Sequence, residues 1–521
     1  MTWVRVEPAA RAFSGVAPGA LVWLAGPVLA AMVVALLMAR VPASGRAVQV
    51  RWNDQFVDAA ERQTLERRLQ LLNPVYLGGT KWGYILGDPS PENVALLANA
   101  SGALDVDFIE RDPPKAVGAS IIRMAGPFAV QSLVCLAVAV LLLAGSFAHT
   151  RAWRQAYFFT ACAMFAAAWT WCLLPVHAGH EVDSWMGDYN TYTEDRAHFE
   201  GYFGYDAVRF HLHLGGFLLN LVDRALGSTA ASPHASFIIT SWVMGALFLI
   251  GMATVAMSAG WTPRTMRYAA LAAAAPQALT FFGYREVGYF ALDVSVFPML
   301  AGALAAPDGA AVINRLHAVG VVQGLRSALH GFGLVGLGGA MVAGAIPRGP
   351  LGWRAERMMA IATWGLAAYL GWVLIYVIVL GLDVIPGHAT GITLRPLVTP
   401  YVSQDGVVTP FLSAAGIRDI AFESVMVGLP VLALGLLVGG KSEERLIAAG
   451  FSCLSLLFLL FFWPAQGIGM DADSVFAIFP AFFAGAWLCA SSVRATVAGV
   501  GLLAAAHAVF WYVIRNSEFL A

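Results

Sequence analysis

The amino-acid sequence predicts an all-α polytopic membrane protein with about thirteen transmembrane helices and a small external α/β domain. Hydrophobic residues make up 59% of the 521 residues and charged residues 12%, whereas an average soluble domain has roughly 25% charged residues. Crossing about 30 Å of hydrocarbon takes a helix of roughly 20 apolar residues. Stretches 20–39, 126–148 and 364–382 reach that length, and we expect helices over about 121–147, 156–176 and 229–258. Most acidic residues fall in alternate gaps between such stretches, so we expect any chemistry to face one compartment.

The charge balance and the cysteines exclude several classes of function. A net charge of −1, without any long Lys/Arg run, gives no reason to expect a nucleic-acid partner. The five cysteines all lie inside apolar stretches: Cys135, Cys162, Cys172, Cys453 and Cys489. No Cys-x-x-Cys pair or Cys/His cluster occurs among them, so buried, inert thiols are favoured over disulfides or a zinc site.

Basic residues in the short gaps predict the orientation of the chain. Every second gap is short and basic and is expected to be cytoplasmic; these gaps hold Arg5, Arg11, Arg151, Arg154, Arg264, Arg267, Arg315, Arg348, Arg354, Arg357, Lys441, Arg445 and Arg494. The alternate gaps are longer, carry the acids and are expected outside: 41–120, 177–233, 284–287, 328–331, 383–416 and 464–473. The apolar run within 1–40 is too long for a signal-peptide core, so we expect an uncleaved first transmembrane helix with a cytoplasmic amino terminus and an external carboxyl terminus.

The first external gap, 41–120, reads as a domain in its own right, placed before a membrane core at 121–515. Its expected elements are strands at 47–52, 82–86 and 106–109 and helices at 58–71 and 90–100. Alternating strands and helices over about 75 residues suggest a compact, ferredoxin-like α/β unit. The sequence does not indicate its role, and packing or docking of a partner protein is the expected use.

The second external gap, 177–233, concentrates acids, arginines and histidines at the end of a predicted span. Acids beside arginines suit a phosphate-bearing lipid, because arginine binds phosphate with two parallel hydrogen bonds and a carboxylate can take a proton from an attacking hydroxyl. The alternative is that many of these acids are solvated or pair with neighbouring arginines. His177 with His180, and His211 with His213, lack the spacing of a metal-binding helix face, so hydrogen-bonding histidines at the membrane interface are favoured over a histidine metal cluster.

Charged residues at other external span ends form a second group of candidates, because charge at membrane depth is costly. They are Arg285, Glu286, Arg326, His330, Arg418, Asp471 and Asp473. If the spans form a bundle, these residues should meet an acid from 181–195 and Arg209 around one external cavity.

The layout of 175–227 resembles the C-type glycosyltransferase fold of polyprenyl-phosphate-sugar-dependent membrane enzymes. Such enzymes place a catalytic carboxylate in the first long external loop after a span, followed by juxtamembrane helices. Here Asp183 and Asp188 lie nearest the span. Segments 281–286 and 469–476 also resemble recurring segments of such bacterial proteins. The chain departs from the pattern in the helix pair and α/β domain that precede the core, and in a loop without an adjacent Asp-Asp or Asp-Glu pair.

The resemblance implies transfer of a sugar from a polyprenyl-phosphate carrier to a glycan, lipid or protein acceptor at the outer face of a bacterial inner membrane. It implies Asp183 or Asp188 as the base, Glu286 as a second catalytic, positioning acid, and Glu181, Asp195, Arg209, Arg285, Arg326, His330, Arg418, Asp471 and Asp473 as substrate-binding residues, with Arg209, Arg285 or Arg326 on the phosphate. No cofactor is certain, and a divalent cation stays open. Two alternatives are a flippase, polymerase or transporter of polysaccharide intermediates, and a non-catalytic membrane scaffold.

Overall fold

The computed structural model describes most of the membrane core expected from the sequence and part of the α/β unit. The described residues are 46–52, 68–69, 71–78, 81–86, 90–99, 103–108, 126–171, 232–276, 278, 291–305, 310–329, 333–346, 350–380, 400–402, 408–410, 421, 424–425, 427–461 and 478–518. They are mostly helical, which confirms the expectation of a mainly α protein. The predicted first transmembrane helix in 1–40 lies outside them.

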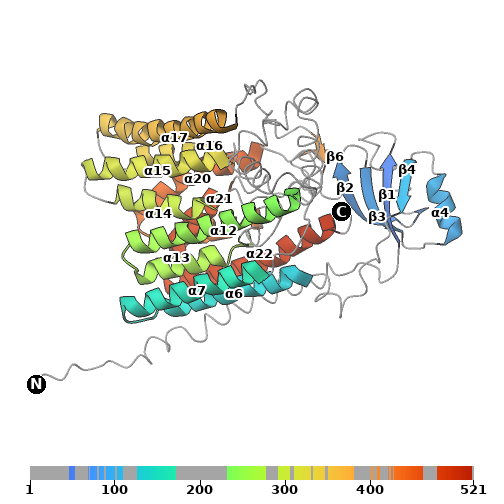
Figure 1. Cartoon of the computed structure of the whole chain (residues 1–521), viewed down its shortest axis with the longest axis horizontal. Helices are drawn as coiled ribbons and strands as arrows, with labels where there is room; N and C mark the ends of the chain where they lie inside the picture. The colour runs from blue at the N-terminus through green and yellow to red at the C-terminus, as the bar shows by residue number, and fades with distance from the viewer. Residues whose placement is uncertain are drawn as a thin grey trace, which may run out of the picture.

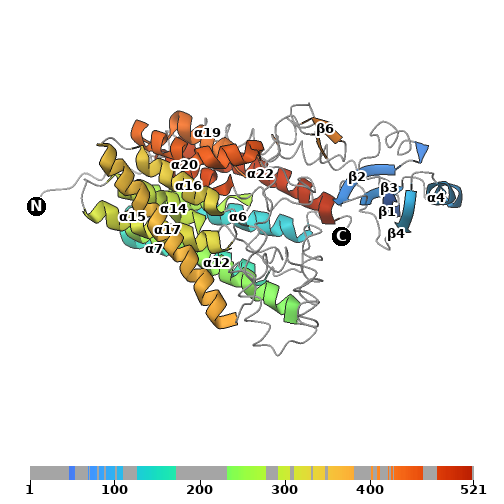
Figure 2. The ribbon, with the colours of Figure 1, turned by 90° about the horizontal axis from the view of Figure 1, so that it is seen from above.

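Twelve helices of the described core pack side by side into one bundle (Figures 1 and 2). They are α6 (Gly126–Gly145), α7 (Arg151–Trp171), α12 (Ser232–Ser258), α13 (Pro263–Ala273), α14 (Asp293–Leu304), α15 (Ala310–Leu329), α16 (Gly333–Ala345), α17 (Leu351–Leu380), α19 (Leu429–Val438), α20 (Ser442–Phe461), α21 (Phe479–Cys489) and α22 (Val493–Glu518). Two of the predicted helices, at 121–147 and 156–176, correspond to α6 and α7.

One described helix is long and apolar enough to cross a membrane by its length and composition, the part of α17 from Leu351 to Ile375. Shorter apolar helical segments are Ser132–Gly145, Val243–Ser258, Asp293–Leu304, Gly333–Ala345, Leu429–Val438, Phe479–Cys489 and Val493–His507. The expected number of about thirteen transmembrane helices therefore stays a prediction, because a single helix of the described part meets the criterion.

Short connections join consecutive helices at one end of the bundle, the left end in Figure 1. They follow α6, α12, α14, α16, α19 and α21. At the other end, α7, α13, α17 and α20 stop before the long segments 172–231, 279–290, 381–399 and 462–477. The alternation of short basic gaps and long acidic gaps thus corresponds to the two ends of one bundle. Which end faces the cytoplasm stays a prediction.

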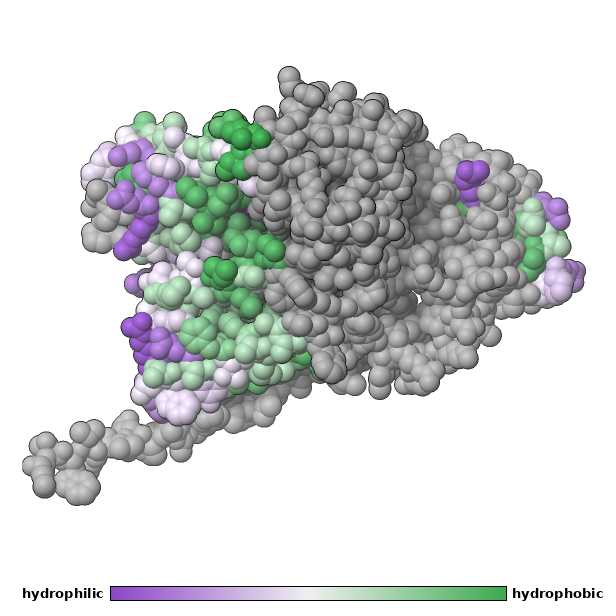
Figure 3. Space-filling view, in the orientation of Figure 1, coloured by the Kyte–Doolittle hydropathy of each residue, from purple (hydrophilic) through white to green (hydrophobic). Residues whose placement is uncertain are grey.

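Both the inside and the outside of the bundle carry large apolar side chains. Exposed examples include Leu133, Val140, Phe159, Ile250, Trp364, Leu366, Leu370, Leu374, Ile375, Ile378 and Leu457. Figure 3 shows hydrophobic residues gathered over the helices and hydrophilic residues at the end with the short connections. A helix that is apolar on all sides is typical of a protein interior or of a lipid environment. Exposed apolar surface on this scale marks a contact with a membrane or a partner protein.

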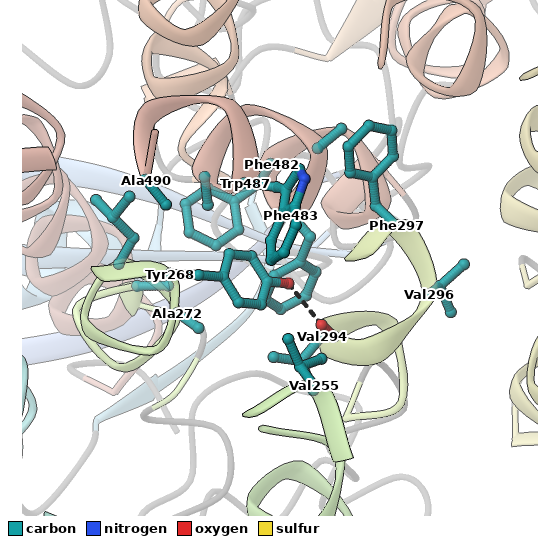
Figure 4. Packing of buried hydrophobic residues seen from close by; sticks show 14 of the residues in the cluster. Val255, Tyr268, Ala272, Val294, Val296, Phe297, Phe482, Phe483, Trp487 and Ala490 are labelled. Carbon is teal, nitrogen blue, oxygen red and sulfur yellow. Dashed lines mark hydrogen bonds between the residues drawn. The ribbon is translucent and has the colours of Figure 1, made fainter. Parts of the chain in front are cut away.

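The helices pack through small residues and through contacts between aromatic rings. A Cβ added to Gly320 of α15 would lie 2.5 Å from the backbone oxygen of Ile361 in α17, so these two backbones touch, as in membrane helix pairs with small residues at the interface. Elsewhere in the core, Tyr268 lies against Trp487, with ring centroids 5.5 Å apart. Its hydroxyl donates a hydrogen bond to the carbonyl oxygen of Val294 (Figure 4).

Apart from the bundle, a four-stranded antiparallel sheet has the order β2-β3-β1-β4. Its strands are β1 (Arg46–Trp52), β2 (Leu71–Gly78), β3 (Lys81–Leu86) and β4 (Ala103–Phe108), and α4 (Pro91–Ala98) lies between β3 and β4 in sequence. Val48 and Val50 alternate along β1 and are both buried. The α4 helix starts as its sequence predicts, because the Ser90 hydroxyl caps it by accepting from the Asn93 amide, and Pro91 occupies its first turn.

Strand β2 was not expected from the sequence. Segment 58–71 was expected to be a helix, but Leu71 begins β2 instead, and 58–67 lies outside the described residues. Pro74 lies within β2, where the register with β3 shifts between Leu72 and Val75. A proline at such an irregularity hides the alternating pattern by which a strand is recognised. A further strand pair, β5 (Pro400–Val402) and β6 (Val408–Pro410), was also not expected.

Candidate functional site

Among the residues that the sequence nominates for a site, Arg326 is the one that the described part contains. All the others lie outside it: Glu181, Asp183, Asp188, Asp195, Arg209, Arg285, Glu286, His330, Arg418, Asp471 and Asp473. The expected convergence of these residues on one cavity therefore stays a prediction. The structure shows the contacts that surround Arg326.

Arg326 forms a buried ion pair with Asp293, a residue that the sequence analysis did not nominate. Its Nε lies 3.2 Å from Oδ1 and 3.1 Å from Oδ2 of Asp293. Both side chains have an exposed fraction of 0%. Arg326 was expected to line an external cavity; the structure shows its side chain buried and paired with a carboxylate of the chain itself.

The helix ends favour both charges of this pair. Asp293 is the first residue of α14, and Arg326 lies in the last turn of α15. The amino end of a helix stabilises a negative charge and the carboxyl end stabilises a positive one. Because α14 and α15 are consecutive helices joined at their other ends, the start of α14 lies beside the end of α15. The pair therefore lies at the end of the bundle that leads to the long acidic segments.

A polar face of α15 continues from Arg326 toward the inside of the bundle. Gln323 lies one turn away with an exposed fraction of 0%, and neither atom of its amide has a hydrogen-bond partner among the described residues. Its amide packs against Gly336 of α16, where an added Cβ would lie 2.9 Å from Oε1. A Cβ added to Gly333 would lie 2.8 Å from Nη1 of Arg326. The two glycines thus leave room for two long polar side chains beside the turn between α15 and α16.

Pairs of this kind are not explained by stability. Replacing a buried ion pair by well-packed apolar residues is often neutral or stabilising, and an ionisable residue in an apolar helix bundle is by default a functional candidate. The sequence did contain a signal for Asp293: it is an acid within the apolar stretch 291–304. Its partner could not be deduced, because the two residues are 33 positions apart.

A second buried polar contact joins three helical elements near the same end. The Ala274 carbonyl oxygen lies 2.9 Å from Nε2 of His507 and can only accept, so Nε2 carries the proton. Nδ1 is then free to accept from the Ser132 hydroxyl, 2.8 Å away. His507 belongs to α22, Ser132 to α6, and Ala274 is the carboxyl-terminal cap of α13. The contact ties together helices that are far apart in sequence.

Several arginines at the opposite end of the bundle make contacts that hold the helices together. Arg267 and Arg445 donate to backbone oxygens at the carboxyl ends of α21 and α19. These carbonyls have no partner within their own helix, and a positive charge is favourable there. Arg264 holds Glu444 with two hydrogen bonds of 2.8 and 3.0 Å and lies over the ring of Trp487. Burial raises the pKa of Glu444, but the hydrogen bond and charge of Arg264, together with Lys441, outweigh this and lower the pKa below its usual value. These arginines are already engaged within the bundle.

No family model matches the chain, and no curated protein sequence matches it. Within the described residues, no group of three or more His, Cys, Asp or Glu side chains lies close enough to hold a metal ion. The assignment of a function therefore depends on the residues of the chain and on their placement.

Proposed function

We propose that the chain is a polytopic glycosyltransferase of a bacterial inner membrane, which transfers a sugar from a polyprenyl-phosphate carrier to an acceptor at the outer face. The observation that carries this proposal is the difference between the two ends of the bundle. One end has short connections, and several of its arginines hydrogen-bond to helix ends. The other end holds the Asp293–Arg326 pair, and its helices lead to the segments that carry the acids.

This difference is what a one-sided membrane enzyme requires. Basic short connections are retained on the cytoplasmic side of a membrane, so the other end would face the outside, where a lipid-linked donor is used. In this proposal the chain has about thirteen transmembrane helices, and the sheet formed by β1 to β4 belongs to an external α/β domain. The apolar surface of the bundle supports the location of these helices in a membrane (Figure 3).

The proposed reaction is one displacement at the anomeric carbon of the donor sugar. Asp183 or Asp188 takes the proton of an acceptor hydroxyl, whose oxygen forms the new glycosidic bond. The bond between the anomeric carbon and the phosphate oxygen breaks, and polyprenyl phosphate leaves with the electron pair. Arginine hydrogen bonds stabilise the negative charge on the leaving phosphate; the candidates are Arg209, Arg285 and Arg326.

Removing the proposed base gives the first test. We expect Asp183→Asn or Asp188→Asn to lower sugar transfer by about 100-fold or more, since an asparagine cannot accept the proton, while the protein still folds. Transfer would be measured with protein purified in lipid nanodiscs and a panel of radiolabelled polyprenyl-phosphate-linked hexoses and pentoses. Glu443→Gln, a change of one exposed acid at the opposite end of the bundle, is the matched control and should leave transfer unchanged.

The same preparation separates the proposal from its main alternative. If both asparagine variants keep full activity, neither aspartate is the base and the proposed site is wrong. If the wild-type protein moves the lipid-linked sugars across the bilayer of sealed vesicles and releases no polyprenyl phosphate, the protein is a carrier and not a transferase.

A further inference from the structure

Arg326 lies close enough to the end of the bundle for its guanidinium to reach the expected surface of the membrane. It lies three residues before the last residue of α15, and Asp293 is the first residue of α14. One helical turn is about 5.4 Å long, so a movement of about that size takes the guanidinium past the helix end. The long stem of an arginine allows its charged group to reach a polar boundary while its carbons stay in apolar surroundings.

We infer that Asp293 is an internal counter-ion that competes with the phosphate of the lipid donor for Arg326, and so sets the affinity of the protein for that donor. This inference rests on the proposed function and adds to it a residue that controls donor binding. Both oxygens of Asp293 accept from Nε of Arg326. A phosphate binds a guanidinium through the same charge-assisted hydrogen bonds, so the two anions compete for one cation.

The surroundings of the pair fit this role better than a purely structural one. Gln323, one turn further along the same face, is a buried amide without a hydrogen-bond partner in the described part of the chain. Such a group lowers stability compared with an apolar side chain of the same shape. Gly333, the first residue of α16, packs so closely against Arg326 that an added Cβ would lie 2.8 Å from Nη1. Polar groups that do not serve stability thus gather where the guanidinium can approach the boundary.

Neutralising Asp293 should strengthen binding of the donor lipid. We expect Asp293→Asn to bind polyprenyl monophosphate about tenfold more tightly than the wild type, because a competing charge next to Arg326 is removed. Arg326→Gln should bind it about tenfold more weakly, and Asp293→Glu, which keeps the charge, should bind as the wild type does. The measurement is equilibrium binding of fluorescent polyprenyl monophosphate to the full chain in nanodiscs.

Glu444→Gln is the matched control. It removes one acid from another arginine–carboxylate pair, with Arg264, at the opposite end of the bundle. The change in net charge is the same as in Asp293→Asn, but it lies at the other end of the bundle from Arg326. The affinity of Glu444→Gln should therefore equal that of the wild type. An equal gain in affinity for both variants would show that net charge is responsible, and would contradict the inference.

The remaining outcomes also decide the matter. An Asp293→Asn protein that folds and binds no more tightly than the wild type contradicts the inference alone. An Asp293→Asn protein that cannot be recovered folded, even when polyprenyl monophosphate is present throughout purification, contradicts it too, because the pair would then serve the fold. A wild-type protein that binds no polyprenyl monophosphate contradicts the proposed function as well.

Discussion

Arg326→Met is expected to lower the free energy of unfolding by about 3–5 kcal/mol, because it leaves the carboxylate of Asp293 buried without its cation. Both side chains are enclosed, with an exposed fraction of 0%. The short side chain of an aspartate at the start of α14 cannot carry its charge far from the helix. Unfolding of the purified protein by increasing proportions of sodium dodecyl sulfate, followed by tryptophan fluorescence, would measure this loss.

The double variant Asp293→Asn/Arg326→Met provides the control for this prediction. It removes both charges together, so most of the stability lost in Arg326→Met should return. Asp293→Asn alone should cost less than Arg326→Met, because the arginine that remains can move its charge toward the boundary. A double variant as unstable as Arg326→Met would show that the loss comes from packing and not from an uncompensated charge.

Gly324→Ala is expected to destabilise the bundle by at least about 1–3 kcal/mol, the range for overpacking in a tight core. Gly324 of α15 faces Gly365 of α17, and an added Cβ would lie less than 3.0 Å from the Gly365 carbonyl oxygen. That neighbour is backbone, so it cannot rotate away and the two helices would have to separate. The same unfolding measurement would detect the change.

Gly371→Ala on α17 is the matched control for Gly324→Ala. A Cβ added to Gly371 meets no atom within 4 Å, so alanine should be neutral or stabilise by up to about 1 kcal/mol through its better helix propensity. If Gly324→Ala were as stable as Gly371→Ala, the close contact between α15 and α17 would not be a determinant of the fold.

The helical part of the fold was predictable because its signal is local. Long apolar runs separated by polar gaps predicted α6, α7 and α12, and the errors lie at their boundaries. The helix expected at 156–176 begins at Arg151, because the Thr150 hydroxyl accepts a hydrogen bond from the Trp153 amide and so caps the first turn. A polar first turn does not show in a pattern of apolar residues. Strand β2 was missed because Pro74, at the irregular register between Leu72 and Val75, interrupts the alternating pattern of a strand.

The candidate site was predictable only in part, because it depends on contacts between distant residues. Arg326 was recognised as a charge at a span end, but neither its burial nor its partner follows from composition or spacing. Asp293 meets Arg326 because two consecutive helices turn back on each other. The Ser132–His507 contact spans 375 positions. Local patterns indicate where polar residues are costly, but not which of them the packing of helices brings together.

The most direct test of the central claim, a membrane protein whose acidic segments face outside, is the topology of the chain in a bacterial membrane. Paired reporter fusions, one type active only inside the cell and the other only outside, would be placed along the chain. The account predicts cytoplasmic signals for 149–155, 261–267, 347–357 and 440–446, and external signals for 41–120, 177–233 and 383–416. A cytoplasmic signal for 177–213 would contradict it, because the proposed base would then lie across the membrane from its lipid-linked donor.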